Sequence, residues 1–181
     1  MSQEALKAAL TGTMEAISKN PAGAKLVFNA KTKLVEGVRC SATVRDFEPM
    51  GVDEPPELGG EDSAMNPVEL VLVALGTCQE IMYAAYASVM GIKLDGVTVD
   101  VKGYLDAQGL FGMANVPPGY EKLRFETNIS SSAAPDQIRQ LVETVEAHCP
   151  VLDTLTRSVE TTGISYLNGE IVNQPVAKAA G

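Results

Sequence analysis

Basic side chains are in short supply in this chain of 181 residues: 14 lysines and arginines stand against 23 aspartates and glutamates, a formal net charge of −9 at pH 7. A surface with this excess of negative charge repels nucleic-acid backbones and anionic lipid headgroups. We therefore expect neither nucleic acid nor a membrane among its partners. Apolar residues at 45% and charged residues at 20% are typical of a globular protein with a substantial core.

Cysteine and histidine, the usual ligands of structural zinc, are scarce as well, because the chain has three cysteines and one histidine. By count they could form a Cys₃His zinc site. No two cysteines form a C-x₂-C pair, and the adjacent His148 and Cys149 cannot easily bind one ion together. A structural zinc site is therefore the less favoured alternative, and we expect neither a metal nor a cofactor.

The first residues lack the basic start and apolar run of a secretory signal. The sequence also shows no internal repeat and no linker between domains. We therefore expect one cytoplasmic domain in a reducing compartment, where paired thiols are more often chemical than structural.

The longest apolar stretch, residues 66–91, predicts one long helix. Its ends carry suitable capping residues: Asn66, Pro67, Glu69 and Gly91. The length would allow a membrane span. Glu69, Gln79 and Glu80, together with the absence of basic flanks, instead favour a buried helix at the centre of a soluble protein.

Cys78 lies on the most apolar face of this predicted helix. Steps of three and four residues give an uncharged stripe: Val71, Ala74, Leu75, Cys78, Met82, Ala85 and Val89. Two interpretations stay open at this point. Cys78 is either a small core side chain or a nucleophile to which a neighbour supplies positive charge. The candidates for that charge are Arg39 and Arg45, because a guanidinium stays charged when buried.

Periodicity predicts the remaining elements. Helices are expected over residues 2–19, 134–148 and 150–157, and strands over residues 24–35, 38–47, 97–104, 122–129 and 163–168. By alternation, one face of the second strand (Val38, Cys40, Ala42 and Val44) points to the core. Residues 48–65 form a loop rich in proline, glycine and acid. This order of elements predicts an α+β domain with an antiparallel sheet.

Cys149 is expected to cap the short helix that begins at Pro150, where backbone N–H groups and the positive helix end favour a thiolate. Cys78 receives no such help from its own helix. The two cysteines are 71 residues apart on different elements. A disulfide between them requires Cα atoms within about 7 Å.

Three segments resemble the OsmC/Ohr family of peroxide-resistance proteins. They are residues 56–60 followed by 66–70, the alanine-rich helix with Cys78 twelve residues after Asn66, and residues 147–150 around Cys149. The resemblance spans about residues 25–170. It divides the chain into an N-terminal helical extension, residues 1–22, and an OsmC-like domain, residues 23–181.

The resemblance implies an intertwined homodimer, with curved antiparallel sheets around long central helices and active sites at the subunit interface. It implies that Cys78 is the peroxidatic thiol and Cys149 the resolving thiol. Glu57 matches the loop glutamate that pairs with the family's catalytic arginine. Arg39 is the first choice for that arginine, and Arg45 is the second.

The expected function is therefore thiol-dependent reduction of organic, fatty-acid-like hydroperoxides to alcohols. It proceeds through a Cys78 sulfenic acid and a Cys78–Cys149 disulfide, which an external lipoyl- or thioredoxin-like dithiol reduces. The alternative is a non-catalytic OsmC-like dimer that binds a hydrophobic small molecule at the subunit interface.

Overall fold

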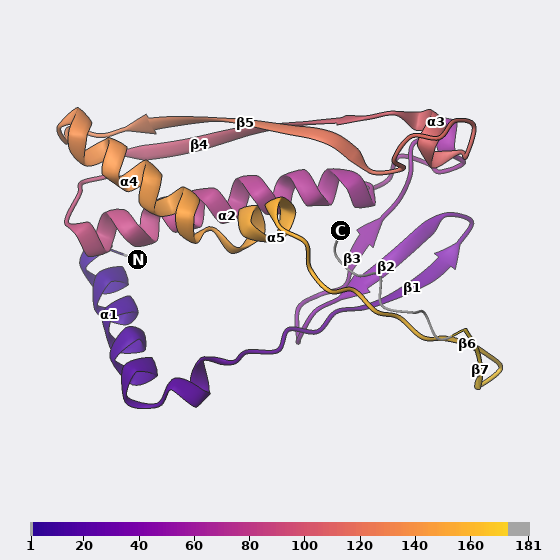
Figure 1. Cartoon of the computed structure of the whole chain (residues 1–181), viewed down its shortest axis with the longest axis horizontal. Coiled ribbons are helices and arrows are strands. Elements are labelled where there is room, and N and C mark those ends of the chain that lie inside the picture. Colours follow the sequence, from indigo (N-terminus) through magenta and orange to yellow (C-terminus); the bar gives the residue numbers. More distant parts are fainter. Residues whose placement is uncertain (1, 174–181) are drawn as a thin grey trace.

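The computed structural model describes residues 2–173, and Figure 1 shows the arrangement of their elements. Residues 174–181, the end of the predicted OsmC-like domain, lie outside the described residues. In chain order the elements are α1 (Gln3–Lys19), η1 (Pro21–Ala24), β1 (Lys31–Glu36), β2 (Arg39–Thr43), β3 (Met50–Val52), η2 (Pro56–Leu58), α2 (Pro67–Met90), β4 (Gly96–Leu105), α3 (Ala107–Leu110), β5 (Tyr120–Ser130), α4 (Pro135–His148), α5 (Pro150–Thr156), β6 (Ser165–Leu167) and β7 (Glu170–Asn173).

Within residues 2–173 the strands form three antiparallel sheets, in the orders β1-β2-β3, β4-β5 and β6-β7. The prediction of an α+β fold with antiparallel sheets is confirmed. In Figure 1 the β4–β5 hairpin lies along one side of α2, α4 and α5 pack beside that helix, and the β1–β2–β3 sheet stands away from the hairpin.

The predicted boundaries of α2 are confirmed, because local capping decides them. The Asn66 side chain accepts from the Glu69 N–H at 2.9 Å, and the Glu69 carboxylate accepts from the Asn66 N–H at 2.9 Å. This reciprocal pair is a capping box. Gly91 ends the helix with φ at 71°, a left-handed conformation that glycine adopts without strain. Among the described residues, α2 alone is long and apolar enough to cross a membrane.

The core is where α2, α4 and the β4–β5 hairpin meet. Its fully buried residues are Tyr83, Ala87, Ile92, Leu141 and Val145. Burying one large apolar side chain stabilises the fold by about 1.5–3 kcal/mol. The inward face predicted for α4 is confirmed, since Leu141 and Val145 are both 0% exposed. Gly76 lets α2 approach β4, because a Cβ there would lie 3.4 Å from a Val101 methyl.

The predicted buried face of α2 is wrong by about one residue. The buried residues are Leu75, Gly76, Gln79, Tyr83, Ala87 and Ser88, so the stripe is centred beside Cys78 rather than on it. The opposite side is open, with Ile81 at 66% exposure, and Val73, on the flank toward β4, is 43% exposed. The helix is apolar on nearly every side, and its hydrophobic pattern therefore does not decide which side faces the core.

The first sheet also departs from expectation. Residues 25–30 lie outside the strand, so β1 is shorter than predicted, and β3 forms within residues that were expected to be loop. Burial does not alternate along β2, whose five residues are all half-buried. The predicted inward face containing Cys40 is therefore wrong for the single chain. A sheet packed on neither face in its own chain has no burial pattern to display.

Candidate active site

Two thiols meet where α2 passes the junction of α4 and α5. The Cys149 Sγ lies 3.3 Å from the Cys78 Sγ, and both thiols are free. A disulfide bond is about 2.0 Å long, so a shift of little more than 1 Å would join them. Cys149 is 0% exposed, whereas Cys78 is half-buried. An incoming molecule therefore reaches Cys78 more easily than Cys149.

The buried stripe of α4 positions Cys149. Leu141, Val145 and Cys149 follow one another at four-residue spacing, and all three are 0% exposed. Pro150 begins α5 immediately afterwards, so Cys149 occupies the joint between two helices. One turn of α2 beyond Cys78, Met82 packs against the core. The packing of α4 on α2 thereby sets the distance between the thiols.

The surroundings of Cys78 raise the pKa of its thiol. Burial is the main cause, and the neighbouring Cys149 thiol adds to it, while the Val151 backbone N–H beside Cys78 acts in the opposite direction. The sequence assigned the amide groups at the start of α5 to Cys149. In the structure Cys149 occupies the N-cap position without a side-chain capping hydrogen bond. The Val151 N–H, which favours a thiolate, therefore lies beside Cys78. The expectation that the start of α5 would favour a thiolate at Cys149 is corrected.

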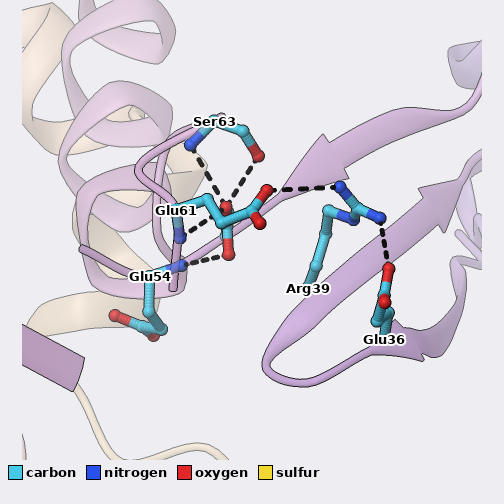
Figure 2. Close-up of polar contacts among 6 residues, drawn as sticks. Glu36, Arg39, Glu54, Glu61 and Ser63 are labelled. Carbon is cyan, nitrogen blue, oxygen red and sulfur yellow. Dashed lines mark hydrogen bonds and ion pairs between the residues drawn. The ribbon is translucent and has the colours of Figure 1, made fainter. Parts of the chain in front are cut away.

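The structure does not bring the predicted arginines to the thiols within one chain. Arg39 donates to Glu36 at 2.9 Å and pairs with Glu61 at 3.7 Å, as Figure 2 shows. The Arg45 guanidinium lies 4.5 Å from the centre of the Phe47 ring. Neither is among the groups that shift the pKa of Cys78.

Glu57 lies in η2 and is exposed, and it takes no part in the ion pairs recorded within residues 2–173. In the single chain, Glu61 is the residue of this loop that pairs with Arg39. The third thiol, Cys40, lies in β2, where its Sγ is 3.8 Å from the Val38 carbonyl oxygen. The structure therefore brings Cys78 and Cys149 together as free thiols, and the other predicted site residues lie apart from them.

Asp53 organises the loop that precedes α2, and sequence reasoning missed it. It is 2% exposed and accepts hydrogen bonds from the N–H groups of Glu54 (2.9 Å), Glu61 (3.2 Å) and Ser63 (3.1 Å) and from the Ser63 hydroxyl (2.6 Å). These donors, led by Ser63, lower the pKa of the carboxyl from 3.8 to about 2. Figure 2 shows how the contributing residues converge.

A second missed residue, Gln79, follows Cys78 on α2. Gln79 is 0% exposed, and within residues 2–173 neither its amide nitrogen nor its amide oxygen has a hydrogen-bond partner. The Thr127 hydroxyl on β5 is buried and unpartnered in the same way. A glutamine in an apolar stretch carries no signal of burial, because glutamine is common on helix surfaces.

An apolar groove of about 630 Å³ lies between α2, β5 and α5. Its lining includes Leu75, three residues before Cys78, and Leu152, three residues after Cys149. The rest of its apolar wall comes from Val68, Val71, Leu123, Phe125 and Leu155. The groove is thus within about one helical turn of both thiols and could hold a hydrocarbon group.

The described residues also lack the arrangement that a metal site requires. Over residues 2–173, no group of three or more His, Cys, Asp or Glu side chains is arranged to hold a metal ion.

Comparison with known proteins places the chain in a family. The model of OsmC-like proteins matches residues 60–162. No curated protein matches the chain. An OsmC-like protein from Mycoplasma pneumoniae is similar in structure, with a TM-score of 0.62, 18% identity and coverage of 72% of this chain and 88% of that one.

Two structures of organic hydroperoxide resistance proteins are also similar. The protein from Legionella pneumophila has a TM-score of 0.56 and 21% identity, covering 72% of this chain and 90% of that one. The putative one from Vibrio cholerae has a TM-score of 0.52 and 21% identity, covering 73% and 87%. Since the family match covers more than half of the sequence, the chain belongs to the OsmC-like protein family.

Proposed function

We propose that this protein is a thiol-dependent peroxidase that reduces organic hydroperoxides to alcohols. The observation that carries the proposal is the 3.3 Å separation of two sulfur atoms that are 71 residues apart in sequence. Membership of the OsmC-like family and structural similarity to hydroperoxide resistance proteins support a role in peroxide detoxification.

The unequal exposure of the thiols supports a separate role for each. The Cys78 thiolate attacks the terminal oxygen of the hydroperoxide, the O–O bond breaks, and the alkoxide leaves and takes up a proton as the alcohol. Cys78 is then a sulfenic acid. The buried Cys149 thiol attacks that sulfur, an S–S bond forms, and water leaves. An external lipoyl- or thioredoxin-like dithiol supplies the two electrons that restore both thiols.

A homodimer forms part of the proposal. The chain of 19.1 kDa exposes 13,294 Å². A compact monomer of this mass exposes about 8,400 Å². An obligate homodimer interface buries about 1,000–2,500 Å² on each subunit and would cover part of this excess of about 4,900 Å² per chain. The exposed apolar side chains Val73 and Ile81 on α2 are a suitable part of such an interface.

The dimer also addresses the ionisation of Cys78. Burial raises the pKa of this thiol, and in one chain Arg39 is engaged with Glu36 and Glu61. We therefore place the required guanidinium on the second copy, with Arg39 as the first candidate and Arg45 as the second. Glu57, exposed at the tip of its loop, would hold that arginine in the dimer.

The groove beside the thiols supports a second candidate function. A cavity of about 630 Å³ with a mainly apolar wall suits a hydrophobic ligand whether or not the thiols react. In this alternative the protein is a non-catalytic dimer that binds such a molecule.

Titration of free thiols distinguishes the two functions. One equivalent of cumene hydroperoxide should remove two thiols per chain, and dithiothreitol should restore them. Cys40→Ser, the matched control, should also lose two thiols. Cys78→Ser should lose none, and Cys149→Ser should form a sulfenic acid that dimedone traps. Unchanged thiol content in the wild-type protein would refute the peroxidase and leave the binding function.

A further inference from the structure

The N-terminal helix α1 uses only half of its apolar stripe within its own chain. Leu6 and Leu10 are half-buried at the end of α1 that packs near the C-terminal end of α2. Met14 and Ile17 continue the same stripe at helical spacing but are 61% and 41% exposed. The second half of the stripe therefore lacks a covering surface in the single chain.

The chain that follows α1 is exposed in the same way. After η1, residues 25–30 run extended to β1, with Leu26, Val27 and Phe28 at 70%, 83% and 88% exposure. In Figure 1, α1 and this segment lie on the side of α2 away from the β4–β5 hairpin. Ile81, at 66% exposure, lies opposite the buried face of α2. All of these apolar side chains lack cover from their own chain.

We propose that α1 and residues 25–30 form a clasp that packs on a second copy of this chain. Here "clasp" means Gln3–Lys19 together with residues 25–30. The proposal rests on the homodimer included in the proposed function. It adds a specific role for a helix that lies outside the family match, which begins at residue 60.

The surface area argues for a second copy as the occupant. The chain exposes about 4,900 Å² more than a compact monomer, and the clasp contributes five exposed large apolar side chains to that surface: Met14, Ile17, Leu26, Val27 and Phe28. In a twofold dimer each copy presents the same surface, so each clasp would hold the other subunit. An extended arm that crosses to its partner explains why three consecutive large apolar residues face solvent in one chain.

The test compares two double variants of the full chain. M14E/I17E places two charges on the exposed half of the stripe. A8E/G12E adds the same two charges on the opposite, exposed face of α1, where a Cβ at Gly12 meets no atom within 4 Å. Sedimentation equilibrium gives the dimer dissociation constant, and mixing of differently labelled subunits gives the exchange rate. Circular dichroism checks that the helix content is kept, and M14S/I17S serves as a milder second variant.

The clasp predicts that M14E/I17E weakens the dimer about 100-fold or more, or speeds subunit exchange by a similar factor where the dissociation constant is too small to measure. A8E/G12E should match the wild type. Equal behaviour of the two variants, or a monomeric wild-type protein, would overturn the proposal. A dimeric wild type that loses no thiols to cumene hydroperoxide would instead refute only the peroxidase.

Discussion

Replacing Gln79 should stabilise the protein, because its buried amide group has no partner. The side chain is 0% exposed, and both of its polar atoms lack hydrogen bonds within residues 2–173. A buried polar group left unsatisfied costs about 1–3 kcal/mol. Methionine has nearly the same shape and flexibility but no amide. We expect Gln79→Met to raise the free energy of unfolding by about 1–3 kcal/mol, which corresponds to about 2–12 °C in Tm for a chain of this size.

Thermal or urea unfolding of the reduced protein measures this change, at one fixed protein concentration because dimerisation also contributes to stability. Gln140→Met is the matched control, since Gln140 is exposed on α4 and should change stability by no more than about 0.5 kcal/mol. A less stable Gln79→Met variant would refute the reasoning. It would show that the carboxamide makes a hydrogen bond to an ordered water, to Thr127 or to the thiol of the adjacent Cys78.

Three further predictions concern the loop and the thiols. The pKa of Asp53 is lowered from 3.8 to about 2, so the contribution of this carboxylate to stability should be present above pH 3.8 and lost as the pH falls toward 2. Asp53→Asn should remove that pH dependence, and acid titration followed by circular dichroism measures it. Gly60→Ala should destabilise the same loop, because a Cβ would lie 1.8 Å from the Glu54 carbonyl oxygen, and a Tm equal to that of the wild type would contradict the observed close approach. Cys149→Ser should lower the pKa of Cys78, because the Cys149 thiol contributes to raising that pKa. The pH midpoint of Cys78 alkylation by iodoacetamide reports the shift. An unchanged or higher midpoint would argue against this prediction.

The sequence predicts most elements of this fold where the signals are local. The boundaries of α2 follow from Asn66, Glu69 and Gly91, whose capping interactions involve only neighbouring residues. The long strands β4 and β5 show clear alternation because one of their faces packs on α2. Such features need no knowledge of the rest of the chain.

Features that depend on distant partners could not be predicted in this way. Asp53 acts through Ser63, ten residues later, and nothing in an acidic loop singles out one carboxylate as the buried one. The face of α2 is decided by the hairpin and α4, since the helix is apolar on most sides. The pairing of Arg39 with Glu61 rather than Glu57 depends on the fold of the loop, which is set by Asp53.

The meeting of the two thiols is itself a consequence of core packing, and this leads to a final prediction. Leu141 lies two turns before Cys149 on the same buried stripe of α4. Leu141→Ala should cost about 2–5 kcal/mol through the cavity that it leaves. It should also let the end of α4 move, because the neighbouring turns lose part of their contact with α2.

If the buried stripe of α4 sets the distance between the sulfur atoms, Leu141→Ala should slow disulfide formation after peroxide treatment. The Cys78 sulfenic acid should then have a longer lifetime, and the ratio of dimedone adduct to disulfide measures this change. Ile92→Ala is the matched control, since Ile92 belongs to the same core but lies outside α4. A similar loss of stability without a change in that ratio is expected for the control. Equal ratios in both variants would show that Cys149 is held by the joint at Pro150 rather than by the packing of α4, and the core would then act on stability alone.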